Sequence, residues 1–180
     1  LCQSFLEKFN LKSYCGRWVE EDLKSHLIWQ LQFEHFSDTA LTIANTIIDA
    51  LNEDGYLRIS FEELFDPEER EALGNPSYEE IEKILKIIQK FEPVGIAARD
   101  IRECLLIQLA ELPENTPCVK EAILIVENHL DLVAKHDYSA LCRLYKFSQK
   151  TLNDSIHLIK SLNPSPGYLI SASPSNYEIP

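Results

Sequence analysis

The sequence predicts an all-α protein with two small helical subdomains, a four-helix bundle and a three-helix, helix-turn-helix-like bundle, followed by an extended C-terminal tail. Apolar residues recur every three or four positions along most of the chain, which is the pattern of amphipathic helices. Prolines and glycines separate these stretches. An amphipathic helix cannot bury its apolar face alone, and 45% of the 180 residues are apolar, so we expect the helices to pack together.

Six apolar stripes define the expected helices. A stripe residue contributes about 1.5–3 kcal/mol when it is fully buried, so the stripes also predict the core. In chain order they are Leu23, Leu27 and Leu31; Leu41, Ala44, Ile48 and Leu51; Ile81, Ile84, Leu85 and Ile88; Ile101, Leu105, Leu109 and Leu112; Ile123, Val126, Leu130 and Val133; Leu152, Ile156 and Ile159.

Local signals mark where several helices begin and end. Ser77 is expected to cap a helix, with Glu80 three residues later completing a capping box. Asp66 and Pro67 are expected to open a short helix. Gly55 is expected to end an earlier helix in the left-handed C′ conformation, and Ser148 to cap a late one.

The proline-containing stretch LPENTP, residues 112–117, is the best boundary in the sequence. We expect a lead-in segment at 1–16, an N-terminal helical subdomain at 17–112, and a C-terminal helical subdomain with its extended tail at 113–180. The tail is expected to begin after Leu162, where prolines are frequent and helical periodicity stops. Because the chain contains no Met, we expect it to be a piece of a longer protein.

The net charge of −12 excludes a broadly basic surface for nucleic acid, because phosphate contacts need Lys and Arg in excess. The charge is uneven. Residues 138–180 hold four basic and two acidic side chains, net +2, so residues 1–137 carry −14. No apolar run approaches the roughly 18 residues of a membrane span, and the N-terminus lacks the pattern of a signal peptide. We therefore expect no membrane association.

Neither a metal, nor a cofactor, nor catalysis is indicated. The five cysteines are odd in number and lack C-x-x-C spacing, which argues against disulfides and zinc, and reduced thiols suit the cytoplasm. Cys104 is expected to be a small buried side chain. His129 and His136 are seven residues apart, whereas a metal pair on a helix prefers i, i+4 spacing. No nucleotide-binding or zinc-protease motif occurs, so we expect no enzyme and no cofactor.

The stretch FEPVGIAARDIRECLLIQL, residues 91–109, interrupts a helical pattern and restarts it. Pro93 is expected to end the preceding helix near Phe91, which we expect to be buried. Gly95 permits a sharp reversal of the backbone. The stretch therefore predicts a tight corner between two antiparallel helices.

The charged pair Arg99–Asp100 in this corner has two interpretations. In the first, Asp100 lies in the first turn of the next helix, where it meets the positive end of the macrodipole, and Arg99 pairs with Glu103 four residues later. In the second, Arg99 and Asp100 project toward another subdomain or a partner. The sequence leaves both open.

The same stretch resembles the characteristic motif of the sigma-54 family of bacterial transcription initiation factors. Glu92, Val94 and Ala97 stand where the family usually has Asp, a second Pro and a second Gly. Other segments resemble the family in the same order: LKSHLIWQL, IIDALNEDGYLRIS, HLDLVAKHDYSAL, IKSLNPSPG and NYEIP. The resemblance covers about residues 19–180 and leaves residues 1–15 unmatched.

The resemblance implies the core-binding region of such a factor, an all-helical region in two subdomains that docks on core RNA polymerase. It also implies two functions for regions that are missing from this sequence. A C-terminal region reads promoter DNA, and an N-terminal region answers the activator ATPase.

Two groups of residues are candidates for partner contact. An acidic helical module suits docking on a basic protein surface, and the expected contacts are Phe91, Pro93, Gly95, Arg99, Asp100, Glu20, Glu21, Glu62 and Glu63. A helix-turn-helix rhythm at 137–162 offers a polar face near DNA, formed by Arg143, Lys146, Lys150, Asn153, His157 and Lys160. For this rhythm we favour helix packing, because base-reading helices normally have basic surroundings. The alternatives to polymerase docking are a generic acidic helical adaptor and a helix-turn-helix module that contacts DNA.

Overall fold

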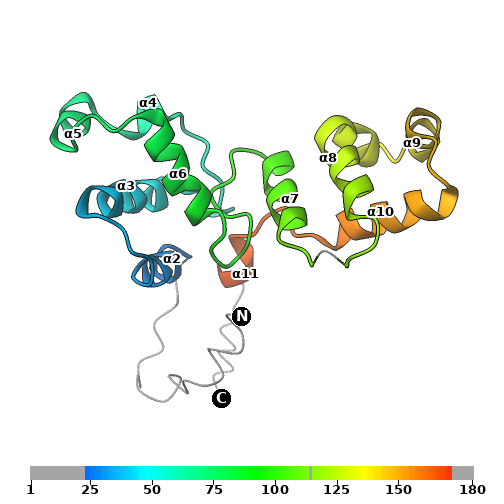
Figure 1. Cartoon of the computed structure of the whole chain (residues 1–180), viewed down its shortest axis with the longest axis horizontal. Helices are drawn as coiled ribbons and strands as arrows, with labels where there is room; N and C mark the ends of the chain where they lie inside the picture. Colours follow the sequence, from blue (N-terminus) through cyan, green and yellow to red (C-terminus); the bar gives the residue numbers. More distant parts are fainter. Residues whose placement is uncertain (1–22, 114, 172–180) are drawn as a thin grey trace, which may run out of the picture.

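The computed structural model describes residues 23–113 and 115–171, and every regular element in these ranges is a helix (Figure 1). This confirms the predicted all-α fold class. None of these helices is long and apolar enough to cross a membrane. The expected lead-in segment 1–16 and the tail beyond residue 171 lie outside the described residues. The helices are α2 (Leu23–Leu31), α3 (Asp38–Asp49), α4 (Phe61–Leu64), α5 (Pro67–Ala72), α6 (Tyr78–Ile88), α7 (Ile101–Ala110), α8 (Val119–Ala134), α9 (Tyr138–Tyr145), α10 (Gln149–Ser161) and α11 (Tyr168–Ser171).

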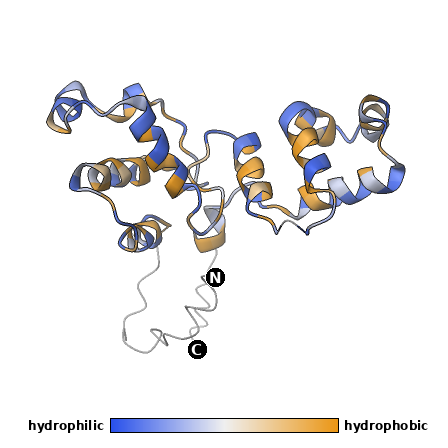
Figure 2. Ribbon diagram, in the orientation of Figure 1, coloured by the Kyte–Doolittle hydropathy of each residue, from blue (hydrophilic) through white to orange (hydrophobic). Residues whose placement is uncertain are grey.

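The first helical unit packs the apolar faces of α2, α3, α4 and α6 around one core. Leu27, Ile47 and Leu85 are fully buried in it, one from each of the three longer helices. Figure 2 shows the apolar residues gathered where α3 and α6 approach each other. Helix α5 contributes no buried residue and carries acidic side chains in its first turn.

The second helical unit is formed by α7, α8, α9 and α10, and Leu109, Ile125, Leu141 and Leu152 are fully buried in its core. Helix α8 bends at His129, whose φ of −139° is not helical. The helix-turn-helix rhythm of the sequence corresponds to α9 and α10 with a three-residue turn between them.

Helix α7 packs in the second unit, although the sequence analysis placed it before the boundary at residue 113. Its buried Leu105 and Leu109 share a core with α8 and α10, whereas the stripe of α6 is buried in the first core. Helices α6 and α7 are therefore not packed together in one core, as the corner led us to expect. The limits 17–112 and 113–180 for the two subdomains remain a prediction. The buried side chains of α7, however, pack with the helices that follow it.

Two residues of the expected stripes are exposed, and three more, Leu112, Ile123 and Leu130, are only partly buried. Leu41 is 40% exposed and Ile101 is 47% exposed. Leu41 lies roughly 90° around α3 from the centre of its buried face, and Ile101 is the first residue of α7, ahead of its buried face. The buried residues of these two helices are Ile43, Ala44, Ile47 and Ile48 in α3, and Cys104, Leu105 and Leu109 in α7.

The predicted helix starts at Ser77, Asp66 and Ser148 are confirmed. At Ser77 both capping-box bonds form: Ser77 N donates to Glu80 Oε2 at 2.8 Å, and Glu80 N donates to Ser77 Oγ at 3.2 Å. Asp66 caps α5, which begins at Pro67. Ser148 Oγ accepts a hydrogen bond from the Thr151 backbone N at 3.1 Å at the start of α10.

Gly55 has the predicted left-handed backbone, with φ +86°, in a different structural role. Helix α3 already ends at Asp49, and Gly55 closes a separate turn in which its N donates to Asn52 O at 2.8 Å. The expected C′ role is wrong because the chain leaves the helix earlier than the glycine signal indicated.

The chain after Leu162 folds back onto the first unit instead of leading away as an extended tail. Residues 163–167 are not helical, as expected, and they run from α10 past α7 to the turn at 52–56 (Figure 1). The short helix α11 follows, and its Ile170 packs against the first core. Prolines exclude a helix at 163–167, and tertiary hydrogen bonds decide the path that the segment takes.

Candidate functional site

The corner between α6 and α7, residues 91–100, is built largely from buried groups. Phe91 is 7% exposed, which confirms its predicted burial. Gly95 has φ +89°, and a Cβ there would lie 2.9 Å from the Sγ of Cys104 and 3.0 Å from its carbonyl oxygen. Pro93 is half-buried and follows a cis peptide bond. Phe91 and Gly95 are therefore enclosed by this chain, and their assignment as partner contacts stays a prediction.

Asp100 is the N-cap of α7 rather than a residue of its first turn. Its Oδ1 accepts a hydrogen bond from the Glu103 backbone N at 2.7 Å. Such a cap contributes about 1 kcal/mol, because it satisfies a backbone donor that the helix leaves unpaired. The charge still faces the positive end of the helix dipole, so the physical reason given by the sequence holds.

Arg99 joins three helices of the same chain. Its guanidinium forms ion pairs with Glu82 of α6 and with Glu103 of α7, the second at 3.9 Å, and it lies over the ring of Phe61 in α4 at 5.2 Å. The Arg99–Glu103 pair confirms the i, i+4 expectation. Since the Arg99 side chain is 47% exposed, each ion pair contributes at most about 1 kcal/mol.

Gln89 at the end of α6 is a buried polar residue that sequence analysis missed. Its Nε2 donates to Glu103 Oε1 at 3.1 Å and to the carbonyl oxygen of Ala97 at 3.4 Å. Glu103 also accepts a hydrogen bond from the Arg99 backbone N at 2.7 Å. In the sequence, Gln89 is only a glutamine that directly follows the apolar stripe of α6. A polar residue at such a position is usually expected to be exposed to solvent.

Cys104 lies behind the corner and is fully buried, as predicted. Its Sγ accepts from Gln108 Nε2 at 3.2 Å, and burial raises the pKa of its thiol. Burial also raises the pKa of the neighbouring Tyr56 phenol, which donates its hydroxyl hydrogen to the carbonyl oxygen of Pro164. A thiol with a raised pKa and no exposure is a poor nucleophile, so the geometry favours a structural role for Cys104.

The glutamates proposed for partner contact lie on the outer edge of the first unit. Glu62 and Glu63 occupy the first turn of α4 and are exposed. Glu63 Oε2 accepts from the Ser60 backbone N at 3.2 Å, and Glu62 Oε1 accepts from the Tyr78 hydroxyl at 3.2 Å. Exposed acidic residues of α5 and its cap continue this acidic edge: Asp66, Glu68, Glu69 and Glu71. The other two proposed glutamates, Glu20 and Glu21, lie outside the described residues.

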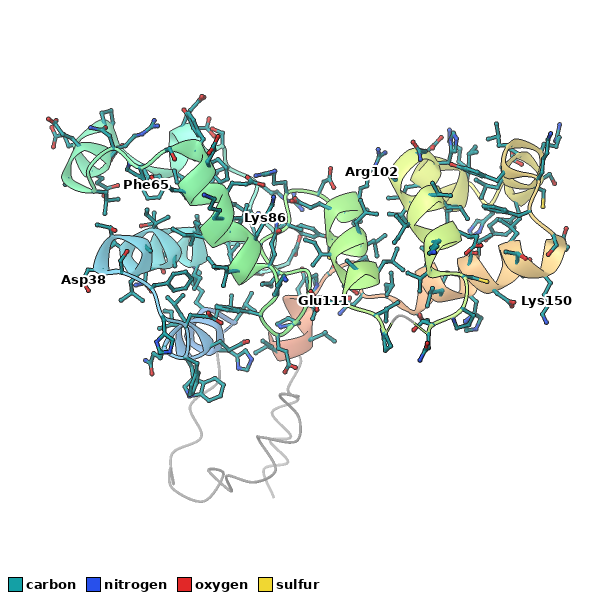
Figure 3. The ribbon with its side chains drawn as sticks, viewed as in Figure 1. Asp38, Phe65, Lys86, Arg102, Glu111 and Lys150 are labelled. Atoms are coloured by element: carbon teal, nitrogen blue, oxygen red, sulfur yellow. The ribbon has the colours of Figure 1, made fainter. Side chains whose placement is uncertain are left out.

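The residues proposed near DNA are all exposed on the second unit, and four of them share one side of α10. On α10 they follow i, i+3, i+7 and i+10 spacing, which places them on one side of the helix, and α9 and the turn add two more. Within residues 23–113 and 115–171 none of the six forms an ion pair. Figure 3 shows Lys150 projecting from α10 away from the core. The set is Arg143, Lys146, Lys150, Asn153, His157 and Lys160.

Trp29 and Phe33 form an exposed aromatic pair that the sequence analysis did not single out. Their rings meet edge to face with centroids 4.8 Å apart, and the residues are 41% and 64% exposed. They lie on and just after α2, on the side away from Leu27. No periodic stripe includes them, so the pattern that identifies the core cannot identify them.

The two histidines considered for a metal do not form a site. His129 lies at the bend of α8, and His136 follows the helix with φ +58° and shares a hydrogen bond of 2.8 Å with the Tyr138 hydroxyl. In the described part of the chain, no group of three or more His, Cys, Asp and Glu side chains is arranged to hold a metal ion.

The fold is that of a helical module, with two packed units that present an acidic edge and a polar helix face. The family model described as "Sigma-54 factor, core binding domain" matches residues 17–180. The chain belongs to the sigma-54 family and is a core-binding domain of that family.

Bacterial proteins named RNA polymerase sigma-54 factor are similar to nearly the whole chain. The protein of Salmonella typhimurium is 42% identical over 162 residues, which is 89% of this chain and 33% of the relative. The protein of Shewanella violacea is 46% identical over 164 residues, 90% of this chain and 32% of the relative. That of Azotobacter vinelandii is 45% identical over 163 residues, 89% of this chain and 32% of the relative. The chain thus spans about a third of the length of the curated relatives it matches.

Proposed function

We propose that this chain docks a sigma-54-type initiation factor on core RNA polymerase for activator-dependent promoter initiation. The observation that carries the proposal is the match of a core-binding domain to residues 17–180. Docking needs surfaces and rigidity rather than chemistry, so the proposal requires no catalytic group and no cofactor from this chain. Its place of action is the bacterial cytoplasm, where polymerase works.

The acidic edge of α4 and α5 is our candidate for the polymerase-facing surface of the first unit. Glu62 and Glu63 are exposed there, and the chain as a whole carries a net charge of −12. A basic partner surface would be attracted over several ångströms, which speeds association and sets the register of docking. Arg99 supports this surface from the corner, because its guanidinium lies over the ring of Phe61 at the start of α4. Asp100, next to it, is proposed as a further contact.

Reading of promoter DNA and the response to the activator ATPase are proposed to belong to other regions of the longer factor. The resemblance assigns the first to a C-terminal region and the second to an N-terminal region. The chain matches only about a third of the length of its relatives, which is consistent with such a division of functions.

The decisive experiment measures binding of the 180-residue chain to purified core polymerase, by a mobility shift and by association kinetics at two salt concentrations. We expect a defined complex whose formation slows as salt rises. Absence of a complex at the highest attainable concentrations would exclude the proposal and leave the generic acidic adaptor as the better interpretation.

The double variant Glu62→Gln and Glu63→Gln tests the acidic edge without disturbing the fold. Glutamine at position 63 keeps the capping-box acceptor, and at position 62 it keeps the acceptor for Tyr78. The matched control is Glu127→Gln in α8, an exposed glutamate of the second unit. We expect the double variant to associate several-fold more slowly and the control to behave as the wild type. Equal rates for all three proteins would remove this edge from the interface.

A second candidate function is an auxiliary contact with duplex DNA through the exposed face of α9 and α10. The observation that favours it is the run of Lys150, Asn153, His157 and Lys160 along one side of α10. A basic or polar helix face within a helix-turn-helix is able to contact the phosphate backbone.

Titration with a duplex at low salt tests this contact. Lys150→Gln and Lys160→Gln are each expected to weaken binding and to reduce its salt dependence, because each removes one phosphate contact. Lys83→Gln on α6 is the matched control, since it removes an exposed lysine of the first unit. Absence of binding at low salt would show that this helix-turn-helix serves packing alone.

A further inference from the structure

Residues 163–167, the segment Asn-Pro-Ser-Pro-Gly between α10 and α11, contact both helical units. At its start, the side chain of Gln108 in α7 pairs with the backbone of Asn163. Gln108 Nε2 donates to the Asn163 carbonyl oxygen at 2.7 Å, and Asn163 N donates to Gln108 Oε1 at 3.0 Å. Gln108 therefore uses the donor and the acceptor of one amide to hold this end on the second unit.

The other end of the segment is held on the first unit. The Tyr56 hydroxyl donates to the Pro164 carbonyl oxygen, and Gly167 N donates to Asp54 O at 3.1 Å. Directly after it, Ile170 of α11 packs against the first core. Within five residues the chain thus passes from one packed core to the other.

Two glycines make the second attachment sterically specific. A Cβ on Gly167 would lie 2.6 Å from the carbonyl carbon of Asp54 and 2.7 Å from Gly55 N, distances that side-chain atoms do not tolerate. A Cβ on Gly55 would lie 3.0 Å from Gly167 N and would also collide with Ile96. The two backbones approach so closely that no side chain fits between them at either position.

The corner is the other connection between the two units. Exposed ion pairs cross it, Arg99 with Glu82 and Lys90 with Glu111, and Gln89 bonds to Glu103. Tyr56 of the first unit also packs with Ala98 and Cys104 in a small buried cluster. The buried faces of α6 and α7 belong to different cores. A second attachment at a separate place restricts rotation of the two units about this corner.

We propose that residues 163–167 form a strap that fixes the orientation of the two helical units, with Gln108, Gly55 and Gly167 as its positioning residues. The strap holds the units together from the C-terminal side, while the corner holds them through α6 and α7. The two surfaces that the chain presents to a partner therefore keep one fixed relative orientation. This fixed orientation does not depend on which partner the chain binds.

Backbone ¹⁵N relaxation of the 180-residue chain measures the tumbling of each unit separately and tests the strap. We expect one common tumbling time for both units of the wild type. In Gly167→Ala, with helicity and the chemical-shift dispersion of both cores retained, we expect the two units to tumble separately. Each tumbling time is then expected to fall toward that of a free unit of its size.

The matched control is Gly74→Ala, at φ +80° with no other atom within 4 Å of the added Cβ. Like Gly167→Ala it adds a methyl group to a glycine, but away from the strap, and we expect it to keep the common tumbling time. Gln108→Leu, which removes both bonds to Asn163, decides the question if Gly167→Ala fails to fold. A common tumbling time in a folded Gly167→Ala or Gln108→Leu variant would overturn the proposal.

Discussion

The side-chain amide of Gln30 in α2 forms two hydrogen bonds with the backbone of Glu92 in the corner. Gln30 Nε2 donates to the Glu92 carbonyl oxygen at 2.6 Å, and Glu92 N donates to Gln30 Oε1 at 2.9 Å. Gln108 makes the same pair of bonds with Asn163. In both places a glutamine on a regular helix supplies the donor and acceptor that an irregular segment lacks, and so fixes its position.

Replacing Gln30 is expected to loosen the corner. Gln30→Ala removes two hydrogen bonds and should lower the free energy of unfolding by about 1–2 kcal/mol. Gln32→Ala, one residue after α2 and exposed, is the matched control and should change it by less than about 0.5 kcal/mol. Urea unfolding followed by circular dichroism measures both. Equal effects at the two positions would show that the bonds to Glu92 contribute nothing to stability.

Adjacent residues of α2 are expected to differ sharply in their effect on stability. Leu27 is fully buried, so Leu27→Ala should cost about 2–5 kcal/mol through lost burial and the cavity left behind. Ile28 is 38% exposed, so Ile28→Ala should cost less than about 1 kcal/mol. Thermal unfolding of the two variants side by side measures the difference. A larger loss for Ile28→Ala would mean that Ile28, and not Leu27, faces the core.

Adding a methyl group at Gly95 is expected to destabilise the protein, whereas removing the methyl group of Ala97 is expected to leave its stability nearly unchanged. Gly95→Ala adds a Cβ at φ +89° that crowds Cys104, at a cost of about 2–4 kcal/mol from backbone strain and overpacking. Ala97 also has a positive φ, +58°, and its methyl group is fully buried. Ala97→Gly relieves strain of about 1 kcal/mol and loses a methyl group of about 0.8 kcal/mol, so its net effect should be close to zero.

Chemical denaturation of these two variants checks the asymmetry of the corner. A fully stable Gly95→Ala protein would show that the corner adjusts to a side chain without cost. A large loss of stability in Ala97→Gly would show that burial of the Ala97 methyl group stabilises the protein by much more than its positive φ destabilises it.

Stability is expected to fall at alkaline pH because of Tyr56 and Cys104. Burial raises the pKa of both groups in the folded protein. Their stabilising contribution is complete below the pKa values of the unfolded chain, ~8.5 for cysteine and ~10 for tyrosine, and is lost as pH rises toward the folded values. In that range the unfolded state holds fewer protons than the native state, so the free energy of unfolding decreases with pH.

Single variants separate the two contributions to this pH dependence. Cys104→Ala should remove the part that begins near pH ~8.5, and Tyr56→Phe the part that begins near pH ~10. Urea unfolding at a series of pH values above neutrality measures the slopes. The double variant should have the flattest profile of the set. Unchanged slopes in all variants would mean that neither buried group is linked to folding.

Several local features of the fold could be predicted from short stretches of sequence. Ser77 and Glu80 form the predicted capping box, and Ser148 caps α10, because capping depends on residues only three positions apart. Leu27 and Leu85 are buried as their stripes predicted. Leu41 was misassigned because a helix with apolar residues on several sides has more than one acceptable stripe, and only the neighbouring helices select one of them.

The candidate contact residues were recognised from charge and motif, and their roles depended on the fold. Arg99 was expected either to pair locally or to project outward. It bridges α4, α6 and α7, and of these contacts only the pair with Glu103 was visible in sequence. Gln30, Gln89 and Gln108 were not identified at all, because a glutamine that bonds to a distant backbone has no periodic signature.

The sequence by itself determined the helical fold class, the helix starts at Asp66, Ser77 and Ser148, the burial of the central stripe residues and the resemblance to one family. These features depend on spacing and chemistry within a few residues. Only the tertiary structure decided that α7 packs with the second core and that residues 163–167 return to the turn at Gly55. The reason is that both depend on which separate segments meet: α7 packs on α8 instead of on α6, and Gln108 bonds to Asn163, 55 residues away. Periodicity along the chain carries no information about such choices.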